Sequence, residues 1–339
     1  MESNRRNFIK TTTMAGAGLS ILPGIPGFET KRAEVPDGKR IGMIGLDTGH
    51  SVAFTKSLND SAAGNTYRGY KVVAAYPNGT ENILAWKERI PEFTAEVKKQ
   101  GVEIVDSIEE LLSKIDVVLL TCIDGNKHLE QVIPVFKAGK PVFIDKPFAG
   151  SLTGAYAIED AAKRYNVPMF SSSSLRYMEG IEVIAGGGTG NVTGAEAYSP
   201  AHREEHHPDL FWYGVHGVEI LFTVMGTGCQ SVKRTTTTDT DLVVGVWDDG
   251  RIGTYRGLRS GKGGYGATVF GEEGITVLDN YQGYNPLLVR IAEFFDTGIP
   301  PFSIKETLEI FAFMQAADVS KERGGLSVDL EEVVKATKK

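Results

Sequence analysis

Short apolar runs alternate with amphipathic stretches along the first half of the chain. Runs of strand length lie at 40–45, 71–75, 102–105, 115–121, 141–145 and 167–172. Helical patterns lie between them at 49–59, 81–89, 91–100, 128–137 and 152–164, and the capping box Ser107-Ile-Glu-Glu110 opens one more helix. Alternating strands and helices predict a doubly wound parallel sheet, a Rossmann-type α/β domain.

After residue 177 the pattern changes to glycine-punctuated, β-rich runs. They lie at 191–198, 229–238, 241–247, 251–258 and 267–278, with helical patterns near 210–225, 285–297 and 304–318. This predicts a second, α+β domain with an open, largely antiparallel sheet covered on one face. We therefore divide the chain into a leader at 1–35, a dinucleotide-binding domain at 36–150 and a second domain at 151–339.

The leader resembles a twin-arginine export signal. Asn4-Arg5-Arg6-Asn7-Phe8-Ile9-Lys10 is followed by a weakly apolar stretch at 11–22. A disordered basic tail is the alternative. We expect an exported, periplasmic protein, and cleavage or retention as an anchor stays open because no small-x-small site precedes Pro36.

Charge and cysteine content exclude several classes. The net charge of −7 argues against a nucleic-acid partner. No run of eighteen apolar residues predicts a membrane span after the leader. Cys122 and Cys229 have no metal-ligand spacing, and we expect two buried thiols.

The first strand–helix turn is a candidate cofactor site. It reads Gly45-Leu-Asp47-Thr48-Gly49-His50, where a dinucleotide turn has Gly-x-Gly-x-x-Gly so that the backbone can approach the pyrophosphate. Gly45 fits the first position, but Asp47 and His50 occupy the second and third. Asp47 beside a diphosphate is unfavourable unless its carboxylate caps the helix.

The end of the second strand leaves the cofactor type open. Ala75-Tyr-Pro-Asn-Gly79 contains no acid for the ribose hydroxyls and no arginine for a 2′-phosphate. NAD and NADP are therefore both candidates. A decayed site that binds no dinucleotide is a third reading.

Lys146 follows the fifth apolar run, in Lys140-Pro-Val-Phe-Ile-Asp145-Lys146-Pro147. The carboxyl ends of strands line the ligand crevice of an open α/β sheet, so we expect Lys146 to be catalytic. A solvated lysine at the strand end is the alternative.

The segments Thr121-Cys-Ile-Asp-Gly-Asn126-Lys-His128, Ala138-Gly139-Lys140-Pro141 and Asp145-Lys146-Pro147 resemble signatures of the Gfo/Idh/MocA oxidoreductase family, with Asp145 where Glu is usual. The resemblance implies NAD or NADP as cofactor, a sugar or cyclic polyol as substrate, and a homo-oligomer built on the open sheet. It implies that Lys146 lies near the nicotinamide, with Thr121, Asn126, His128 and Asp145 beside the cofactor.

His216 is the candidate base in the second domain, because an imidazole titrates near neutral pH. The family places an Asp four residues earlier, where this chain has Trp212. Tyr213, three residues before His216, shares its helix face and is a candidate relay. This Tyr-x-x-His-Gly pattern is similar to the family's NAD-dependent glycosidase branch. A structural histidine and a core tyrosine are the alternatives.

Further polar residues are candidates for substrate binding. The segment 202–209 holds His202, His206 and His207, which we expect to bind substrate hydroxyls. A metal site without standard zinc spacing and a solvated loop are the alternatives, and we predict no metal. Arg176 and Tyr177, after the sixth strand, are expected to contact sugar.

Three functions follow. The first is an NAD(P)-dependent oxidoreductase acting on a CH–OH group of a sugar, sugar derivative or cyclic polyol. The second is a redox-neutral glycosidase or epimerase with a retained cofactor. The third is a non-catalytic sugar-binding protein.

Overall fold

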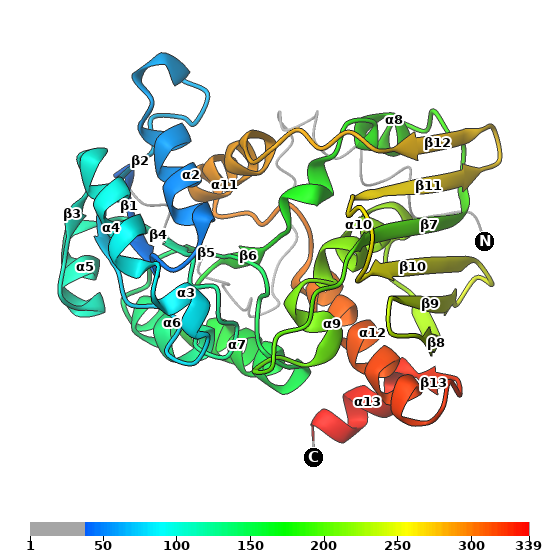
Figure 1. Cartoon of the computed structure of the whole chain (residues 1–339). Coiled ribbons are helices and arrows are strands. Elements are labelled where there is room, and N and C mark those ends of the chain that lie inside the picture. The colour runs from blue at the N-terminus through cyan, green and yellow to red at the C-terminus, as the bar shows by residue number, and fades with distance from the viewer. Residues whose placement is uncertain (1–37, 339) are drawn as a thin grey trace, which may run out of the picture. The chain divides into compact units, whose positions relative to one another are not determined.

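The computed structural model describes residues 38–338, and the predicted export signal lies outside this range. Six parallel strands form the first sheet in the order β3-β2-β1-β4-β5-β6 (Figure 1). They are β1 (Arg40–Ile44), β2 (Lys71–Tyr76), β3 (Glu103–Ile104), β4 (Val117–Leu120), β5 (Val142–Ile144) and β6 (Met169–Ser171). This is the doubly wound Rossmann order, whose ligand crevice opens where β1 meets β4.

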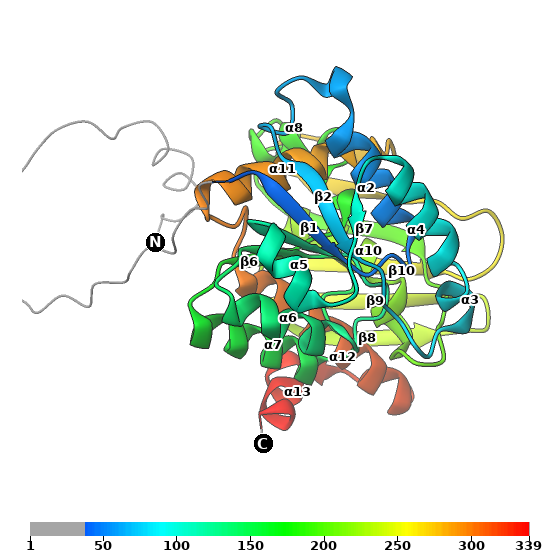
Figure 2. The same cartoon turned by 90° about the vertical axis from the view of Figure 1, so that its left-hand side faces the viewer.

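Helices cover both faces of this sheet (Figure 2). One face carries α2 (Gly49–Asn59), α4 (Ile90–Lys99) and α11 (Asn285–Thr297), and the other carries α5 (Ile108–Lys114), α6 (His128–Lys137) and α7 (Leu152–Tyr165). Along β4, Val117 and Leu119 enter one core while Val118 and Leu120 enter the other. A strand buried on both faces has to be apolar throughout, which explains the uninterrupted run seen in the sequence.

The second sheet has seven strands in the order β12-β11-β7-β10-β9-β8-β13. They are β7 (Val192–Pro200), β8 (Cys229–Thr236), β9 (Thr240–Trp247), β10 (Ile252–Leu258), β11 (Gly266–Gly271), β12 (Ile275–Leu278) and β13 (Val328–Asp329). Within this second sheet, as far as the structure describes it, only the β7–β10 pair is parallel. The predicted fold class is therefore confirmed.

Helices α10 (Val215–Met225) and α12 (Ile304–Glu322) pack on one face of the second sheet, and Figure 1 shows α10 between the two sheets. Along β10, buried residues alternate with accessible ones, as expected for a sheet covered on one side. The shorter helices are η1 (Ser61–Ala63), α3 (Leu84–Lys87), η2 (Ser174–Tyr177), α8 (Ile181–Ala185), α9 (Asp209–Trp212) and α13 (Leu330–Thr337).

Two predicted elements are divided in the structure. The run at 267–278 is two strands, β11 and β12, joined by a turn at 272–274, and the helix at 210–225 is α9 and α10. Tyr213 ends α9 with a φ of −127°, outside the helical region, and its side chain is thereby placed between the two helices. Both thiols are free and buried, as predicted. None of the helices within 38–338 is long and apolar enough to cross a membrane.

Candidate active site

Lys146 directly follows Asp145 at the carboxyl end of β5. Its side chain is buried, and within residues 38–338 no carboxylate oxygen lies within 4 Å of Nζ. The nearest charged group in sequence, Asp145, instead accepts a hydrogen bond from the Lys146 backbone N at 2.8 Å. Burial lowers the pKa of Lys146, and the negative charge of Asp145 opposes this only in part.

His216 occupies the first turn of α10, and its Nδ1 lies 2.7 Å from Ser173 Oγ. Glu219, one turn further along α10, accepts a hydrogen bond from Ser173 N at 3.0 Å. Ser173 and Glu219 thus orient the imidazole. In the family pattern an aspartate does this, at the position where this chain has Trp212. Burial, followed by the charges of Lys146 and His50, lowers the pKa of His216 well below its usual value, so the imidazole is neutral at pH 7.

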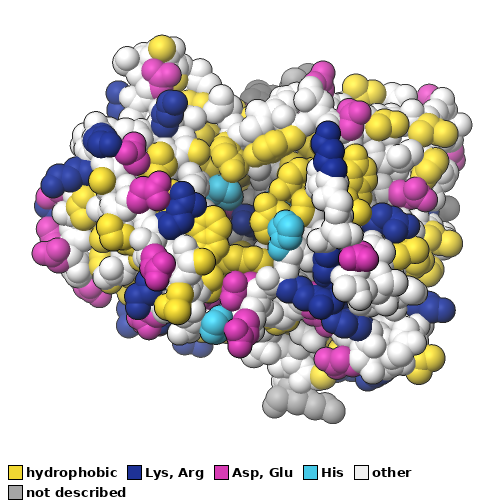
Figure 3. Space-filling view, in the orientation of Figure 1, with side chains coloured by type: hydrophobic (Ala, Val, Ile, Leu, Met, Phe, Trp, Pro, Cys, Tyr) yellow, Lys and Arg dark blue, Asp and Glu magenta, His cyan; other side chains and the backbone are white. Residues whose placement is uncertain are grey.

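Lys146 and His216 line one cavity together with a wall of tyrosines. The lining residues are His50, Lys146, Ser174, Leu175, Tyr213, His216, Tyr265, Tyr281 and Tyr284. The enclosed volume is about 80 Å³. Figure 3 shows apolar and aromatic side chains gathered around a hollow in the middle of this face, with histidine at its edge. The site therefore joins the end of the first sheet to α10 and to the loops after β10 and β12.

The tyrosines hold one another in place. Tyr213 Oη lies 3.0 Å from Tyr265 Oη, and Tyr281 Oη lies 2.8 Å from Ser174 Oγ. The ring of Tyr213 meets the His216 ring edge-on at 5.1 Å, and Lys146 Nζ lies 5.7 Å from the Tyr213 ring centre. Tyr213 thus contacts the catalytic candidates with its ring, while its hydroxyl is paired elsewhere.

His50 also reaches this cavity, from the start of α2. Its Nδ1 lies 2.5 Å from Asp145 Oδ2, and its ring packs on Phe54 and Tyr284. Burial alone would raise the pKa of Asp145, but His50 and Lys146 lower it overall. His50 therefore ties the first strand–helix turn to the strand end that carries Lys146.

Three predicted cofactor residues connect loops instead of lining the cavity. Thr121 Oγ1 donates to Gly45 O at 2.7 Å. The two ring nitrogens of His128 lie 3.1 Å from Phe148 O and 2.7 Å from Cys122 O. Asn126 Nδ2 donates to His206 O at 3.0 Å.

Arg176 is buried and Tyr177 is partly buried, and neither lines the cavity. Arg176 forms ion pairs with Glu219 and Glu306, and its guanidinium lies 4.0 Å from the ring centre of Phe302. Its charge is therefore already matched within the protein. Tyr177 packs in the core beside α11.

The three histidines of 202–207 are dispersed. His202 is exposed, with its ring 5.2 Å from the Tyr213 ring, which places it at the rim of the cavity. His206 is exposed beside Glu204, whereas His207 is buried 4.8 Å from the Trp212 ring. Within the described part of the chain, no three His, Cys, Asp or Glu side chains are grouped to hold a metal ion.

The turn after β1 only partly fits a dinucleotide. Gly45 has the positive φ (86°) of the first glycine, and the space around Gly49 is open. Thr48, not Asp47, caps α2, so the condition placed on Asp47 by the sequence analysis is not met. The Asp47 carboxylate instead bridges the loops after β2 and β4. In this conformation, the backbone N–H groups of Thr80 and Ile123 at the crevice donate to the Asp47 carboxylate.

The sequence did not reveal five lining residues of the cavity, nor Ser173, which contacts His216 behind it. The five lining residues are Ser174, Leu175, Tyr265, Tyr281 and Tyr284. The pair in Tyr281-Gln-Gly-Tyr284, within a glycine-punctuated segment, was a usable signal. Ser173 gave none, because a serine after a strand has many structural uses.

Comparison with known proteins defines the class of the first domain. Residues 39–172 match the Gfo/Idh/MocA model, described as an oxidoreductase family with an NAD-binding Rossmann fold. The first domain is therefore similar to this family, and the NAD-binding description of the family agrees with the predicted NAD or NADP.

Two known proteins are similar in sequence to part of this chain. An uncharacterized oxidoreductase of Streptococcus pneumoniae is 29% identical over 178 residues, 47% of each chain. An inositol 2-dehydrogenase of Cereibacter sphaeroides is 41% identical over 61 residues, 18% of each chain. The chain thus spans about half the length, or less, of the relatives it matches.

Among solved structures, the scyllo-inositol dehydrogenase of Lactobacillus casei with bound NAD(H) and scyllo-inositol is similar, with a TM-score of 0.65 and 15% identity. The match covers 86% of this chain and 99% of that one. At this identity the likeness shows the two-domain fold.

Proposed function

We propose that this chain is an oxidoreductase that transfers a hydride from a hydroxyl-bearing carbon of a sugar or cyclic polyol to NAD⁺ or NADP⁺, while a side chain takes the hydroxyl proton. One observation carries the proposal: buried Lys146 and buried His216, neither paired with a carboxylate in the described chain, face one cavity. The family of the first domain supports the oxidoreductase class. The inositol dehydrogenases among the relatives support a hydroxyl-rich ring as substrate.

His216 is the base for the hydroxyl proton. When Nδ1–H donates to Ser173 Oγ, the lone pair of Nε2 is directed to the cavity. The lowered pKa keeps this lone pair free at neutral pH. A positioned base of this kind contributes about 10²–10⁴-fold to a rate.

Lys146 supplies positive charge beside the same oxygen. A cation in a dry cavity stabilises negative charge that develops as a hydroxyl loses its proton. Because Nζ has no carboxylate partner within 38–338, its charge is available to the substrate.

The tyrosine wall must adjust to the ligand. The enclosed volume of about 80 Å³ is below the roughly 300–1,000 Å³ of small-molecule sites. Tyr281 is 36% exposed and lies between strands and helices in an irregular segment. Movement of Tyr281 would therefore enlarge the cavity for a ring.

A second candidate is sugar binding without turnover. It is favoured by Asp47, which occupies the second glycine position of the dinucleotide turn with its carboxylate fully buried. A protein that keeps the Lys146 cavity but takes up no hydride acceptor would bind a sugar and release it unchanged.

Product analysis separates the two candidates. Wild type and Lys146→Met are incubated with inositols and common aldoses plus NAD⁺ or NADP⁺. Ketone products are measured by mass spectrometry and ligand binding by ligand-observed NMR. Ketone from wild type and none from Lys146→Met supports the oxidoreductase, and binding without ketone supports the second candidate. No binding of any ring to wild type contradicts both.

Export and assembly are separate proposals. We propose that Arg5 and Arg6 direct the protein to the periplasm, as the leader pattern predicts. Replacing both by lysine should retain the protein in the cytoplasmic fraction, and unchanged export would contradict this. A homo-oligomer through the open sheet is tested by light scattering, where a monomeric mass would contradict it.

A further inference from the structure

Asp47 crosses the crevice of the first domain. Its Oδ2 accepts a hydrogen bond from Thr80 N at 2.5 Å, and its Oδ1 accepts one from Ile123 N at 2.9 Å. Thr80 lies in the loop after β2 and Ile123 in the loop after β4, while Asp47 follows β1. One carboxylate thus joins the carboxyl ends of three neighbouring strands, at the place where a Rossmann fold receives a pyrophosphate.

The space around this carboxylate is filled. A Cβ built on Gly79 would lie 2.0 Å from Asp47 Oδ2, so the carboxylate touches the backbone of the loop after β2. Ile83, Ile123 and Trp212 form a small apolar cluster beside the bridge, and all three are at least nine-tenths buried. Trp212 comes from α9, so the second domain contributes to this closure.

A second buried carboxylate reinforces the closure. Thr80 Oγ1 donates to Asp124 Oδ2 at 3.1 Å, and Asp124 Oδ1 accepts from Asn126 N at 3.0 Å. The His207 ring packs 4.8 Å from Trp212, and its Nε2 lies 3.4 Å from Asp124 Oδ1. The loops after β2 and β4 are therefore joined by polar contacts on both sides of Asp47.

Two cavities have lining residues close to the bridge: Gly79, which touches the Asp47 carboxylate, lines one, and His50, three residues after Asp47, lines the other. One, of about 290 Å³, is lined by the ends of β2 and β3 and the starts of α5 and α6, including Tyr76, Gly79, Ser107 and Lys127. The other is the Lys146 cavity. A dinucleotide in a Rossmann crevice runs from the β2 end, where its adenosine ribose binds, across the first turn. The Asp47 carboxylate lies in that first turn, bonded to the loops after β2 and β4.

We propose that the Asp47 carboxylate is an internal occupant of the pyrophosphate position, so that the Asp47 bridge and a bound dinucleotide exclude each other. The backbone N–H groups of Thr80 and Ile123 are already donating to Asp47. A diphosphate beside the same buried carboxylate would add like charge where water cannot screen it. Burial also raises the pKa of Asp47, which shows how dry its surroundings are.

The inference concerns the cofactor position and does not depend on which ring the Lys146 cavity binds. It predicts that the Asp47→Gly substitution, which restores the Gly-x-Gly pattern with Gly45, opens the crevice. NADH and NADPH binding to the full chain is measured by fluorescence and calorimetry for wild type and Asp47→Gly. We expect Asp47→Gly to bind at least about tenfold more tightly, a difference of about 1.4 kcal/mol.

Two further variants keep the test decisive. Asp47→Asn keeps the size of the side chain and one hydrogen-bond acceptor but removes the charge, so its affinity for NADH and NADPH should rise less than that of Asp47→Gly. Asp47→Asn also provides the test if Asp47→Gly does not fold. Asp160→Asn removes an exposed acid on α7 that lines neither cavity, and should change affinity less than about twofold. Wild type binding as tightly as Asp47→Gly, or weaker binding by both Asp47 variants, would overturn the proposal. Ring binding measured by NMR on the same proteins reports on the Lys146 cavity independently.

Discussion

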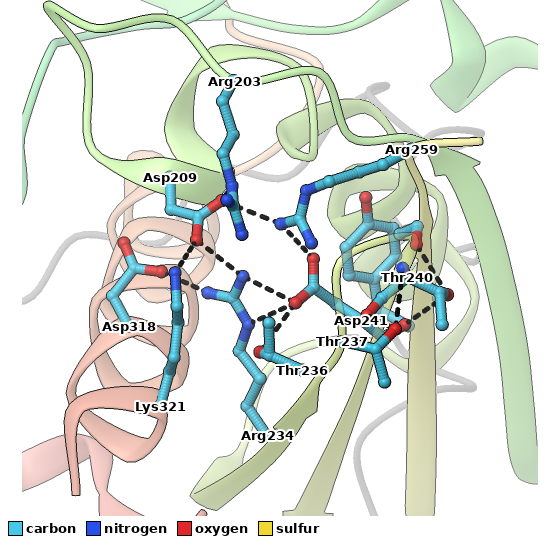
Figure 4. A network of polar contacts seen from close by, with 12 residues as sticks. Arg203, Asp209, Arg234, Thr236, Thr237, Thr240, Asp241, Arg259, Asp318 and Lys321 are labelled. Carbon is cyan, nitrogen blue, oxygen red and sulfur yellow. Dashed lines mark hydrogen bonds and ion pairs between the residues drawn. The ribbon is translucent and has the colours of Figure 1, made fainter. Parts of the chain in front are cut away.

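Buried charge is treated in opposite ways in two regions of this molecule. In the second domain, Arg234 is fully buried and pairs with Asp209 at 2.8 Å, Asp241 at 2.8 Å and Asp318 at 2.5 Å (Figure 4). In the Lys146 cavity, the lysine and His216 have no carboxylate within ion-pair distance in the described chain.

The Arg234 network is built to hold its charges. Arg259 and Lys321 add contacts to Asp209 at 2.9 and 2.6 Å. Burial alone would raise the pKa of Asp209, but the hydrogen bond from Lys321 and the guanidiniums of Arg234 and Arg259 lower it overall. Burial, by contrast, raises the pKa of Asp318 to about 7. The network joins α9 and α12 to β8, β9 and the end of β10.

The Lys146 cavity does the reverse. Burial shifts the pKa values of Lys146 and His216 downward, toward the neutral forms, and no ion pair reverses the shift. Such groups weaken the fold and are kept where chemistry needs them. The two regions therefore differ in role: the paired charges around Arg234 hold elements of the fold together, whereas the unpaired groups Lys146 and His216 are available for chemistry.

The largest expected effect is on turnover. Lys146→Met should lower the rate of ring oxidation by about 10²–10⁴-fold, because it removes the cation beside the reacting oxygen. The free energy of unfolding of Lys146→Met should be equal to or higher than that of wild type, because the variant no longer buries an unpaired charge. Lys140→Met is the matched control: Lys140 donates to Ile115 O before β5 and should leave the rate unchanged. Full activity in Lys146→Met would refute the site.

The next effect is on stability. Arg234→Met removes the guanidinium shared by three carboxylates and should lower the free energy of unfolding by about 3–5 kcal/mol. Asp318 loses its ion-pair partner in the described chain, whereas Asp209 and Asp241 keep Arg259. Urea unfolding measures the free energy. Arg256→Met, on the accessible side of β10, should cost less than about 0.5 kcal/mol. Equal effects of the two variants would remove the distinction drawn above.

A smaller effect is expected from Ser173→Ala, which removes the partner of His216 Nδ1. We expect kcat to fall by about tenfold, with KM little changed and the acid limb of the pH profile displaced. Ser172→Ala is the control, since Ser172 donates to Ser173 O and does not touch His216. A shift of KM alone would show that Ser173 serves substrate binding.

The smallest effect is on the pH dependence of stability. His216 has a lowered pKa in the folded state, so below about pH 6.5 the unfolded chain takes up a proton that the folded chain refuses. Wild type should thus lose stability as pH falls from 6.5, by up to about 1.4 kcal/mol per pH unit. His216→Gln should show a shallower loss, whereas exposed His206→Gln should match wild type. Identical slopes for all three would contradict the neutral, buried His216.

Much of this organisation could be predicted from the sequence. The apolar runs of the first domain predicted its six strands, because a sheet buried on both faces requires them. The position of Lys146 after the fifth run predicted its place at the crevice, since strand ends of parallel sheets meet at one edge.

The rest depends on contacts that no spacing encodes. Ser173 orients His216 across 43 residues, and Asp47 bonds to Thr80 and Ile123 across 33 and 76 residues. Arg176 is as polar in sequence as Lys146, yet Glu219 and Glu306 neutralise it. Whether a charge is paired is decided by the tertiary fold, so the sequence could propose the charged candidates but could not sort them.

The most direct test of the central claim is an NMR titration of the His216 ring in wild type and Lys146→Met. The claim is that both groups share one buried, unpaired site. It predicts a His216 pKa below 6.5 in wild type and a higher one once the lysine charge is removed. A His216 that titrates near 6.5 and does not respond to Lys146→Met would contradict it.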